Sequence, residues 1–528
     1  MALGAAEKDP LPAVDDKWRH YRSPNFELYS HTAERESRQL LHDLETLRGV
    51  FVERFKFVER ARVDVTVFLF RTEEEFKAYG SNTWTKDHQF RGVYLEGRDR
   101  ATISLAPAAD EDAARRLIFH EYVHHLFRAA ELDPPLWFNE GMAELLAGIQ
   151  TDGGKVEIGH PQVGRLVALQ HEKLLPLETL FTVDHGSPIY RSNDHTGMFY
   201  AQSWALLHYW YFGQSKIPKE AVTRFTTVAG DRKAAAEVDL RKFFRECFSM
   251  DYPEMQRQLE WYVSTGSYRY GREPTPKIPA APTYATRAVA RDEIRPRLAE
   301  LLARINRSEL GKFILVDAAA KADRDPRIFE ALGAIALMEN DEAKARERWE
   351  EALAAGSTNQ AIYRELTRLE TRDWFRDFDY YFRLPLPTVA RLRARLKRAI
   401  EYEPLQTTAY ELLAWVEAFA EAPYVPNVNL VQGAFPRLKQ KQRTLLALVL
   451  IRLHSDMKEP ALQLLKDINH FEWDAWAAQS AEVVLAKLED RPVRPINERR
   501  VDNELLVEVT SDPLGLLKYP SVRLPEAR

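Results

Sequence analysis

The chain has 528 residues, of which 45% are hydrophobic and 29% are charged, and its formal net charge is −5. This is an ordinary globular composition, and the length allows two or more domains with separate cores. No apolar run approaches the roughly 18 residues of a membrane-spanning helix, so we expect no membrane span. The charge balance and the lack of a long Lys/Arg block argue against nucleic acid as the main partner. Cys247 is the only cysteine, which excludes an intramolecular disulfide and a Cys-based zinc site.

The amino-terminal part of the chain alternates predicted strands and helices. Residues 26–30 are predicted as a strand and residues 33–55 as a long amphipathic helix. Residues 63–70 alternate and are rich in β-branched side chains, which predicts a buried strand. Two further strands are predicted at 92–95 and 101–105, and the second leads directly into another helix.

That helix carries the sequence His-Glu-Tyr-Val-His at residues 120–124. Two histidines four residues apart lie about 40° apart around a helix axis, so both imidazoles can reach one metal ion. Glu121 lies between them and can serve as a general base. The pattern favours a zinc site in which His120 and His124 are ligands.

A second predicted helix offers the third ligand. Asp133 is expected to cap this helix, which presents Glu140 and Glu144 one turn apart. A catalytic zinc site takes three protein ligands and leaves the fourth position to water. We therefore predict Glu140 as the third ligand and Glu144 as the carboxylate that accepts the outer N–H of a ligating histidine. Gly141 and Ala143 are expected to let this helix approach the first one closely.

These residues resemble the gluzincin metallopeptidases, the clan of thermolysin and the membrane alanyl aminopeptidases, and within it the bacterial peptidase-MA-like group. The matching residues are His120, Glu121, His124, Asn139, Glu140 and Glu144. The resemblance implies a zinc-dependent peptidase domain in which a small mixed sheet is combined with helices. It also implies that an extended peptide substrate adds to an edge strand of the sheet, which we expect within residues 92–105.

The sequence departs from the gluzincin pattern in two ways. The gap between His124 and Glu140 is a few residues shorter than is usual in thermolysin or the aminopeptidases, so we expect a tight connection between the two helices. The Gly-x-Met-Glu-Asn phrase that holds the free amine of an aminopeptidase substrate is missing upstream. Aminopeptidase specificity is therefore not expected.

Residues 199–203 read Phe-Tyr-Ala-Gln-Ser, similar to a helix that peptidase-MA-like proteins carry after the zinc motif. In related gluzincins a tyrosine or histidine downstream of the ligands steadies the oxyanion, and the resemblance assigns this role to Tyr200. Aromatic residues on a helix equally often fill a core, and that interpretation of Tyr200 stays open. Tyr190 and His195 are alternative donors.

The composition suggests four regions. Residues 18–272 are expected to form the gluzincin-like metallopeptidase domain, and residues 273–284 are a Pro-rich segment predicted to act as a semi-rigid linker without helix or strand. Residues 285–490 are predicted to be all-α, which makes the whole chain an α+β protein. Residues 491–528, with their spaced prolines, are predicted to be an extended tail.

Part of the all-α region resembles a tetratricopeptide repeat. Residues of the size usual in that repeat are Leu332, Gly333, Ala336, Ala345, Trp349 and Ala352. Poorer units are predicted at 398–414 and 445–468. Stacked repeats form a superhelix whose concave face can bind a peptide or protein partner. An irregular helical domain without a bound partner fits these patterns equally well.

The favoured interpretation is an enzyme, a zinc peptidase that hydrolyses peptide or protein substrates. One alternative is a catalytically inactive peptidase-like scaffold whose helical repeats bind a partner. Another makes His120 and His124 ordinary half-buried histidines and Glu140 and Glu144 part of a solvated acidic face. The family resemblance favours export to the periplasm or the exterior, although residues 1–16 lack the features of an intact signal peptide.

Overall fold

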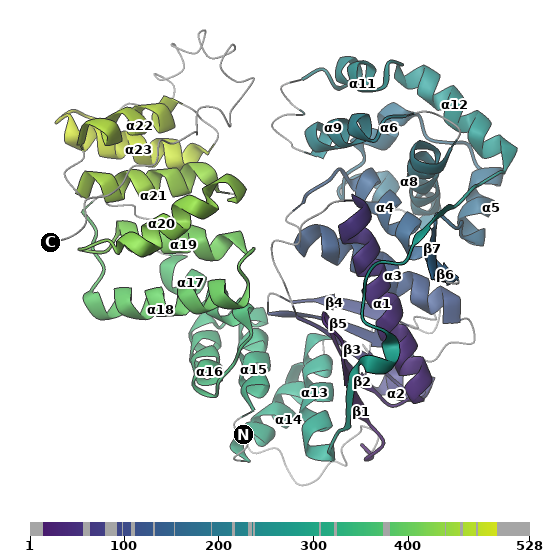
Figure 1. The fold of residues 1–528 in the computed structure, drawn as a ribbon, viewed down its shortest axis with the longest axis horizontal. Coiled ribbons are helices and arrows are strands. Elements are labelled where there is room, and N and C mark those ends of the chain that lie inside the picture. Colours follow the sequence, from purple (N-terminus) through teal and green to yellow (C-terminus); the bar gives the residue numbers. More distant parts are fainter. Residues whose placement is uncertain are drawn as a thin grey trace. The chain divides into compact units, whose positions relative to one another are not determined.

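The chain folds as an α+β protein that divides into two compact units, residues 1–357 and residues 358–528 (Figure 1). The computed structural model describes residues 14–55, 64–79, 92–97, 99–106, 111–129, 132–152, 154–191, 193–213, 217–230, 235, 238–305, 308–321, 325–372, 381–438, 440–454, 458–470 and 474–493. The first unit contains both β-sheets, and the regular elements described in the second unit are helices.

A six-stranded mixed sheet forms the centre of the first unit. Its strand order is β4 (Gly92–Glu96), β5 (Arg100–Leu105), β3 (Asp64–Leu69), β2 (Phe26–Ser30), β1 (Arg19–Arg22) and β9 (Ala285–Ala288). Strands β2, β3 and β5 are parallel, whereas β4, β1 and β9 run antiparallel to their neighbours. The four strands predicted from the sequence are confirmed. Among the described residues β4 has a neighbouring strand on one side only, so it is an edge strand.

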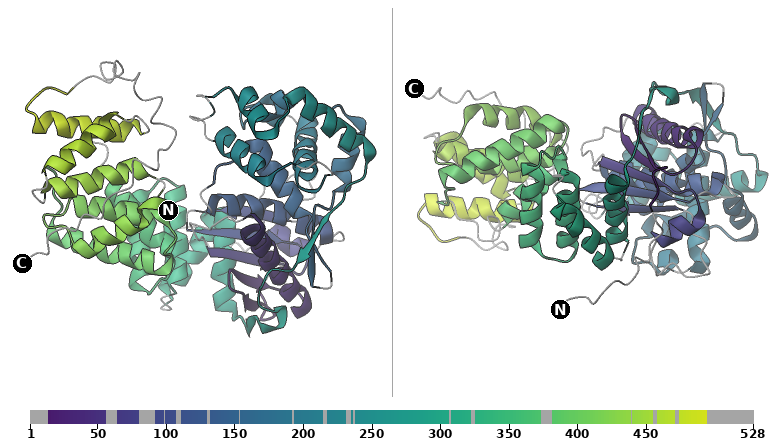
Figure 2. Two further views of the ribbon diagram at one scale, coloured as in Figure 1. Left: turned by 45° about the horizontal axis from the view of Figure 1, so that its top comes forward. Right: turned by 90° about the horizontal axis from the view of Figure 1, so that it is seen from below.

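Helices cover both faces of this sheet because strand side chains alternate between its faces (Figure 2). Val67 and Ile103 belong to a core shared with helices α1 and α3, whereas Tyr29 and Phe68 pack with α2 and α13. These helices are α1 (Glu34–Phe55), α2 (Glu73–Ala78), α3 (Glu111–Ala129) and α13 (Arg291–Arg304). The expected amphipathic helix at 33–55 is therefore confirmed as α1.

The remaining elements of the first half follow α3 in the chain. They are α4 (Leu136–Ala147), β6 (Gln150–Asp152), β7 (Lys155–Ile158), α5 (Val163–His171), α6 (Leu177–Thr182), α7 (Pro188–Arg191), α8 (Asn193–Phe212), α9 (Lys219–Gly230), α11 (Leu240–Phe248), α12 (Tyr252–Thr265) and β8 (Gly271–Pro274). Strands β6, β7 and β8 form a small antiparallel sheet. Helix α4 lies between α3 and α8.

Gly141 sets the approach of α4 to α8. A Cβ atom at this position would lie 2.6 Å from the carbonyl oxygen of Ser203 on α8. The small residue therefore serves the contact with α8, not the contact with α3 that the sequence suggested.

We predict that Gly141→Ala lowers the free energy of unfolding by about 1–3 kcal/mol, because the added methyl group has no space beside the α8 backbone. Gly197→Ala is the matched control on α8, where nothing lies within 4 Å of the new Cβ. There the better helix propensity of alanine should raise stability by up to about 1 kcal/mol. Thermal unfolding of both variants measures the two changes in stability. Equal changes in Gly141→Ala and Gly197→Ala would contradict the packing described for Gly141.

The Pro-rich segment 273–284 is not the spacer that its composition predicted. Its first residues end β8, which pairs with β7, and the 3₁₀ helix η1 (Ala281–Thr283) precedes β9, which pairs with β1. Arg38 of α1 donates hydrogen bonds to the carbonyl oxygens of Ala281 and Tyr284 at 3.0 and 2.9 Å. The prediction was wrong because the segment's backbone finds partners on the first unit despite its prolines.

The division between the units accordingly falls after Ser357, not at the Pro-rich segment. Helices α14 (Ser308–Ala320), α15 (Pro326–Met338) and α16 (Glu342–Ala354) belong to the first unit. Buried polar contacts join α15 to the sheet: Arg327 donates to Thr66 Oγ1 of β3 at 2.7 Å, and Glu330 forms an ion pair with Arg100 of β5. Separating this helix from the sheet would leave buried charges without partners, which costs several kcal/mol of free energy, about 3–5 for one broken pair.

The second unit is a series of helices. They are α17 (Gln360–Thr371), α18 (Leu386–Tyr402), α19 (Thr407–Ala418), α20 (Val425–Ala434), η3 (Phe435–Arg437), α21 (Lys441–His454), α22 (Lys458–His470) and α23 (Ala475–Leu488). Helices α18, α19, α21 and α22 stack in sequence order (Figure 1). Most of the predicted tail, residues 494–528, lies outside the described residues.

Helix pairs occur where repeat units were predicted, at α15/α16, α18/α19 and α21/α22. In the first pair, a Cβ at Gly333 would come within 2.3 Å of the Trp349 ring, whose Nε1 donates to the Glu330 carbonyl at 3.1 Å. Helices α15 and α16 therefore pack closely, as the small residue at position 333 allows. Membership in the tetratricopeptide family stays a prediction. None of the described helices combines the length and apolarity needed to span a bilayer.

Candidate metal centre

Helices α3 and α4 bring three ligand-type atoms together. His120 Nε2 lies 3.1 Å from His124 Nε2, and Glu140 Oε2 lies 3.2 and 3.3 Å from these two nitrogens. The three atoms form a nearly equilateral triangle. Across the part of the chain that the structure describes, this is the one group of three His, Cys, Asp or Glu side chains arranged to hold a metal ion.

Local structure explains the convergence. His120 and His124 occupy successive turns of α3 on one face, and Glu140 lies in the first turns of α4, which packs against α3. Helix α4 begins after Pro135, and no side chain caps it, so the prediction that Asp133 is the N-cap was wrong. Two prolines follow Asp133 and set an extended backbone before the helix, which shifts its start past the expected cap.

The outer nitrogen of each histidine meets an oxygen. His120 Nδ1 lies 3.2 Å from Glu144 Oε1, and His124 Nδ1 lies 2.9 Å from Asn139 Oδ1. Such partners hold each ring by an Nδ1–H donor, which turns Nε2 toward the centre of the triangle. Glu144 therefore lies where the sequence predicted. Asn139 entered the sequence analysis only as part of the resemblance, and its contact with His124 comes from the structure.

The triangle fits a tetrahedral zinc ion. Ligand atoms at zinc–nitrogen and zinc–oxygen distances of 2.0–2.1 Å in a tetrahedron lie about 3.3 Å apart, close to the observed spacings. Glu140 Oε2 is buried and has no hydrogen-bond partner among the described residues, although both imidazoles are near. Two imidazole nitrogens and a carboxylate oxygen are also the donor set of known catalytic zinc sites.

The charges around the triangle attract a cation. Burial raises the pKa of Glu140, but His120 and His124 bring it down to about 2, so the carboxylate is ionised. Burial lowers the pKa of His120, but Glu140 and Glu144 more than offset this and raise it to about 10. Without a metal ion, a proton on His120 can supply the positive charge between the carboxylates at neutral pH. Metal binding displaces such a proton.

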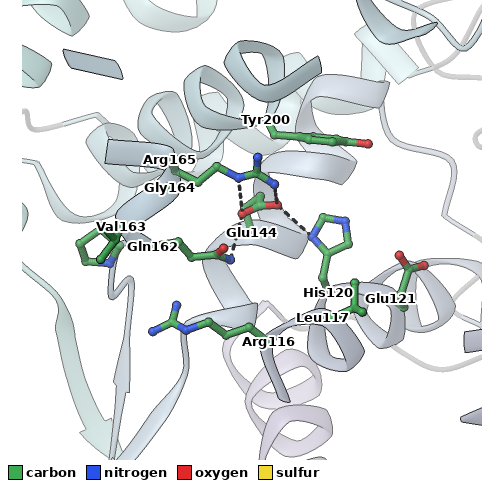
Figure 3. A pocket seen from close by; sticks show the side chains of 11 residues that line it. Arg116, Leu117, His120, Glu121, Glu144, Gln162, Val163, Gly164, Arg165 and Tyr200 are labelled. Atoms are coloured by element: carbon green, nitrogen blue, oxygen red, sulfur yellow. Dashed lines mark hydrogen bonds and ion pairs between the residues drawn. The ribbon is translucent and has the colours of Figure 1, made fainter. Parts of the chain in front are cut away.

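Glu121 lies beside the triangle on a pocket of about 540 Å³, which His120, Glu144 and Tyr200 also line (Figure 3). It is half-buried and belongs to α3, one residue after the first ligand. The pocket gives a substrate access to this carboxylate and to the ligand His120 together.

Tyr200 of α8 stands across the pocket from Glu121, and its ring centre lies 6.0 Å from that of His120 (Figure 3). Arg165 lies over its face, 5.0 Å from the ring centre. Burial, followed by the charge of Glu140, raises the pKa of the Tyr200 hydroxyl, so the group is protonated and can donate a hydrogen bond. Tyr200 is therefore part of the pocket wall and not only of the core.

The two alternatives to Tyr200 have different positions. Tyr190 of α7 donates a hydrogen bond to Glu140 Oε1 at 3.1 Å, so it holds the carboxylate oxygen that does not face the histidines. The side chain of His195 lies outside the described residues. His125 is buried away from the triangle with its Nδ1 2.8 Å from the Tyr94 hydroxyl, and burial lowers its pKa to about 3.

Helix α5 contributes residues that the sequence analysis missed. Arg165 donates to Glu144 through Nη2 and Nε at 2.6 and 3.1 Å, and Gln162 Nε2 donates to the same carboxylate at 3.0 Å. Burial raises the pKa of Glu144, but His120 and Arg165 lower it to about 2. No motif in the sequence marks Arg165 and Gln162, because their approach to Glu144 depends on how distant segments pack.

No protein-family model matches the chain, and a search of curated proteins finds no match. The functional inference therefore rests on the geometry of this site and on the motif residues that form it.

Proposed function

We propose that the protein is a zinc-dependent peptidase of the gluzincin type, with His120, His124 and Glu140 as the zinc ligands. The observation that supports this most strongly is the triangle of Nε2, Nε2 and Oε2 atoms at 3.1–3.3 Å beside an accessible carboxylate. A bound zinc ion supplies Lewis acidity, which makes water nucleophilic at neutral pH and polarises a carbonyl group.

Glu121 is proposed as the general base. It takes a proton from the attacking water as the new C–O bond forms, and then passes this proton to the nitrogen of the leaving amine as the C–N bond breaks. Its half-buried position on the pocket, next to His120, supports this role. Glu144 and Asn139 orient the two ligand histidines, and Tyr190 orients Glu140.

The substrate is proposed to bind as an extended peptide along β4. This strand is at the edge of the sheet, antiparallel to β5, and β5 is the strand that precedes α3. An edge strand offers main-chain donors and acceptors to a further strand, which gives affinity with little dependence on sequence.

The proposal is tested by cleavage of a mixture of unstructured peptides, followed by mass spectrometry. Zinc-loaded protein is expected to cut internal or terminal peptide bonds, a chelator to stop this, and added zinc to restore it. No cleavage by the zinc-loaded protein across the mixture would contradict the proposal.

Tyr200 is proposed to donate a hydrogen bond to the carbonyl oxygen as it becomes negative. Loss of one such donor typically costs about 10²–10³-fold in kcat, so we predict a loss of this order for Tyr200→Phe with little change in zinc content. Tyr190→Phe is the comparison, because it removes the contact with Glu140 and should weaken zinc binding instead. Zinc affinity and kcat measured for both variants separate the roles, and the reverse pattern would exchange them.

Asn139 is proposed to fix the orientation of His124 through Nδ1. We predict that Asn139→Ala weakens zinc binding by about 10–100-fold, the usual cost of losing a residue that orients a ligand. Asn139→Asp keeps an oxygen acceptor at the same place and should bind zinc nearly as well as wild type. Competition against a chromophoric chelator gives both affinities; equal losses in the two variants would contradict this role.

We also propose that the all-α region consists of tetratricopeptide-like repeats that hold a peptide or protein partner, which its helix pairs support. Export of the protein is a further proposal, supported by the family resemblance. The inactive-scaffold alternative predicts a chain that binds a partner and cleaves no peptide. The cleavage experiment on zinc-loaded protein distinguishes the two.

A further inference from the structure

The pocket beside Glu121 extends away from the proposed reaction site. One turn before His120, Arg116 and Leu117 of α3 line it, and Gln162, Val163 and Arg165 form its opposite wall. In Figure 3, Glu121 lies on one side of His120, and Arg116, Gln162 and Arg165 lie on the other. The pocket therefore has a reaction end and a distal end.

The distal end is rich in guanidinium groups. Arg116 lines the pocket, and its neighbour Arg115 donates to the Ile149 carbonyl at 2.8 Å and lies over the Phe119 ring. Arg165 brings a second guanidinium from the opposite wall. The carboxylate between the walls, Glu144, already accepts contacts from His120, Arg165 and Gln162.

The wall that carries Arg165 is held in place before any substrate arrives. His208 Nε2 lies 3.0 Å from the Gly159 carbonyl, where the chain leaves β7, and the two hydrogen bonds from Arg165 to Glu144 hold the far end of the segment. A wall fixed in this way lowers the entropic cost of binding.

We propose that the distal end of this pocket is a subsite for a carboxylate of the peptide substrate, with Arg116 as the specificity-determining residue. This proposal rests on the proposed peptidase function. A guanidinium presents paired N–H donors that match a carboxylate, and Leu117 and Val163 offer apolar surface to the methylene groups that carry it. The carboxylate belongs either to a Glu or Asp side chain next to the scissile bond or to the carboxyl terminus of a short peptide.

Peptides in which a single Glu is moved through an otherwise neutral sequence test the proposal, with Gln and Lys versions as controls. We expect Glu at one position flanking the cut to raise kcat/KM about tenfold or more over Gln, in line with hydrogen bonds to charged groups. The preference should shrink as salt is added. Amidating the carboxyl terminus separates the two sources: if amidation slows cleavage of every peptide and the Glu and Gln versions are cut equally, the carboxylate that binds is the terminal one.

Arg116→Glu should reverse the preference, so that Lys or amidated peptides are cut better than acidic ones. This gain cannot come from misfolding. Arg257→Glu on α12, where the arginine side chain is 66% exposed, is the matched control and should keep the wild-type preference. Equal cleavage of Glu and Gln peptides by wild type together with no effect of amidation, or an unchanged preference in Arg116→Glu, would overturn the subsite.

Failure of the subsite and failure of the peptidase proposal give different results. If no peptide is cut, the peptidase proposal fails, and calorimetric binding of the same peptides to zinc-loaded Glu121→Gln protein then decides the subsite. Tighter binding of the Glu peptide than of the Gln peptide, or of the free-carboxyl peptide than of its amidated form, supports it, and equal binding of all these peptides overturns it.

Discussion

Glu121→Gln is expected to lower kcat for peptide hydrolysis by about 10²–10⁴-fold, the usual contribution of a general base, while the protein keeps its zinc. Glutamine has nearly the same shape but cannot accept a proton from water. Glu121 contributes none of the three ligand atoms of the triangle, so its replacement leaves the triangle intact.

The measurement pairs steady-state kinetics with elemental analysis of the same preparation. Glu254→Gln on α12, whose carboxylate is 42% exposed, controls for the loss of one negative charge and should behave as wild type. Turnover retained by Glu121→Gln would remove this residue from the mechanism, and zinc lost from it would show that it is needed to hold the metal.

Glu140→Ala is expected to lose zinc. The substitution removes one of three ligands and leaves His120 and His124 as a two-nitrogen site, so we predict that zinc affinity falls by more than about 100-fold, beyond the cost of losing an orienting residue. Peptide hydrolysis should fall with it, because the Lewis acid is lost.

Folding is the necessary control for this variant, because Glu140 is 3% exposed. Circular dichroism and thermal unfolding of the zinc-free proteins establish that Glu140→Ala still folds, and Glu140→Gln provides a neutral variant of the same size. A folded Glu140→Ala protein that still holds one zinc per chain would contradict the ligand assignment.

Much of the first unit could be predicted because its signals are local. Alternation and β-branched residues are sufficient to place β3, and helical periodicity places α1 and α3. The metal triangle was predictable for a related reason: a spacing of four residues in a helix fixes the relative direction of His120 and His124. Glu140 was predicted from its place on the next predicted helix and from the need for a third ligand, and the resemblance to known peptidases supported it.

The parts that could not be predicted depend on contacts between distant segments. Arg165 reaches Glu144 of α4 because α5, which follows the β6–β7 hairpin in the chain, packs against α8, and α8 also packs against α4. The pairing of β9 with β1 joins residues more than two hundred positions apart, and composition around the prolines carries no sign of it. The predicted start of α4 was wrong for a local reason: the N-cap of this helix is Pro135, two residues after the predicted cap Asp133.

The proposed metal centre stands or falls on the zinc content of the wild-type protein, purified without chelator and measured by elemental analysis. We predict close to one zinc per chain, either as purified or after incubation with zinc and removal of the excess. A folded protein that holds no zinc under both conditions would contradict the proposed metal centre and, with it, the peptidase function.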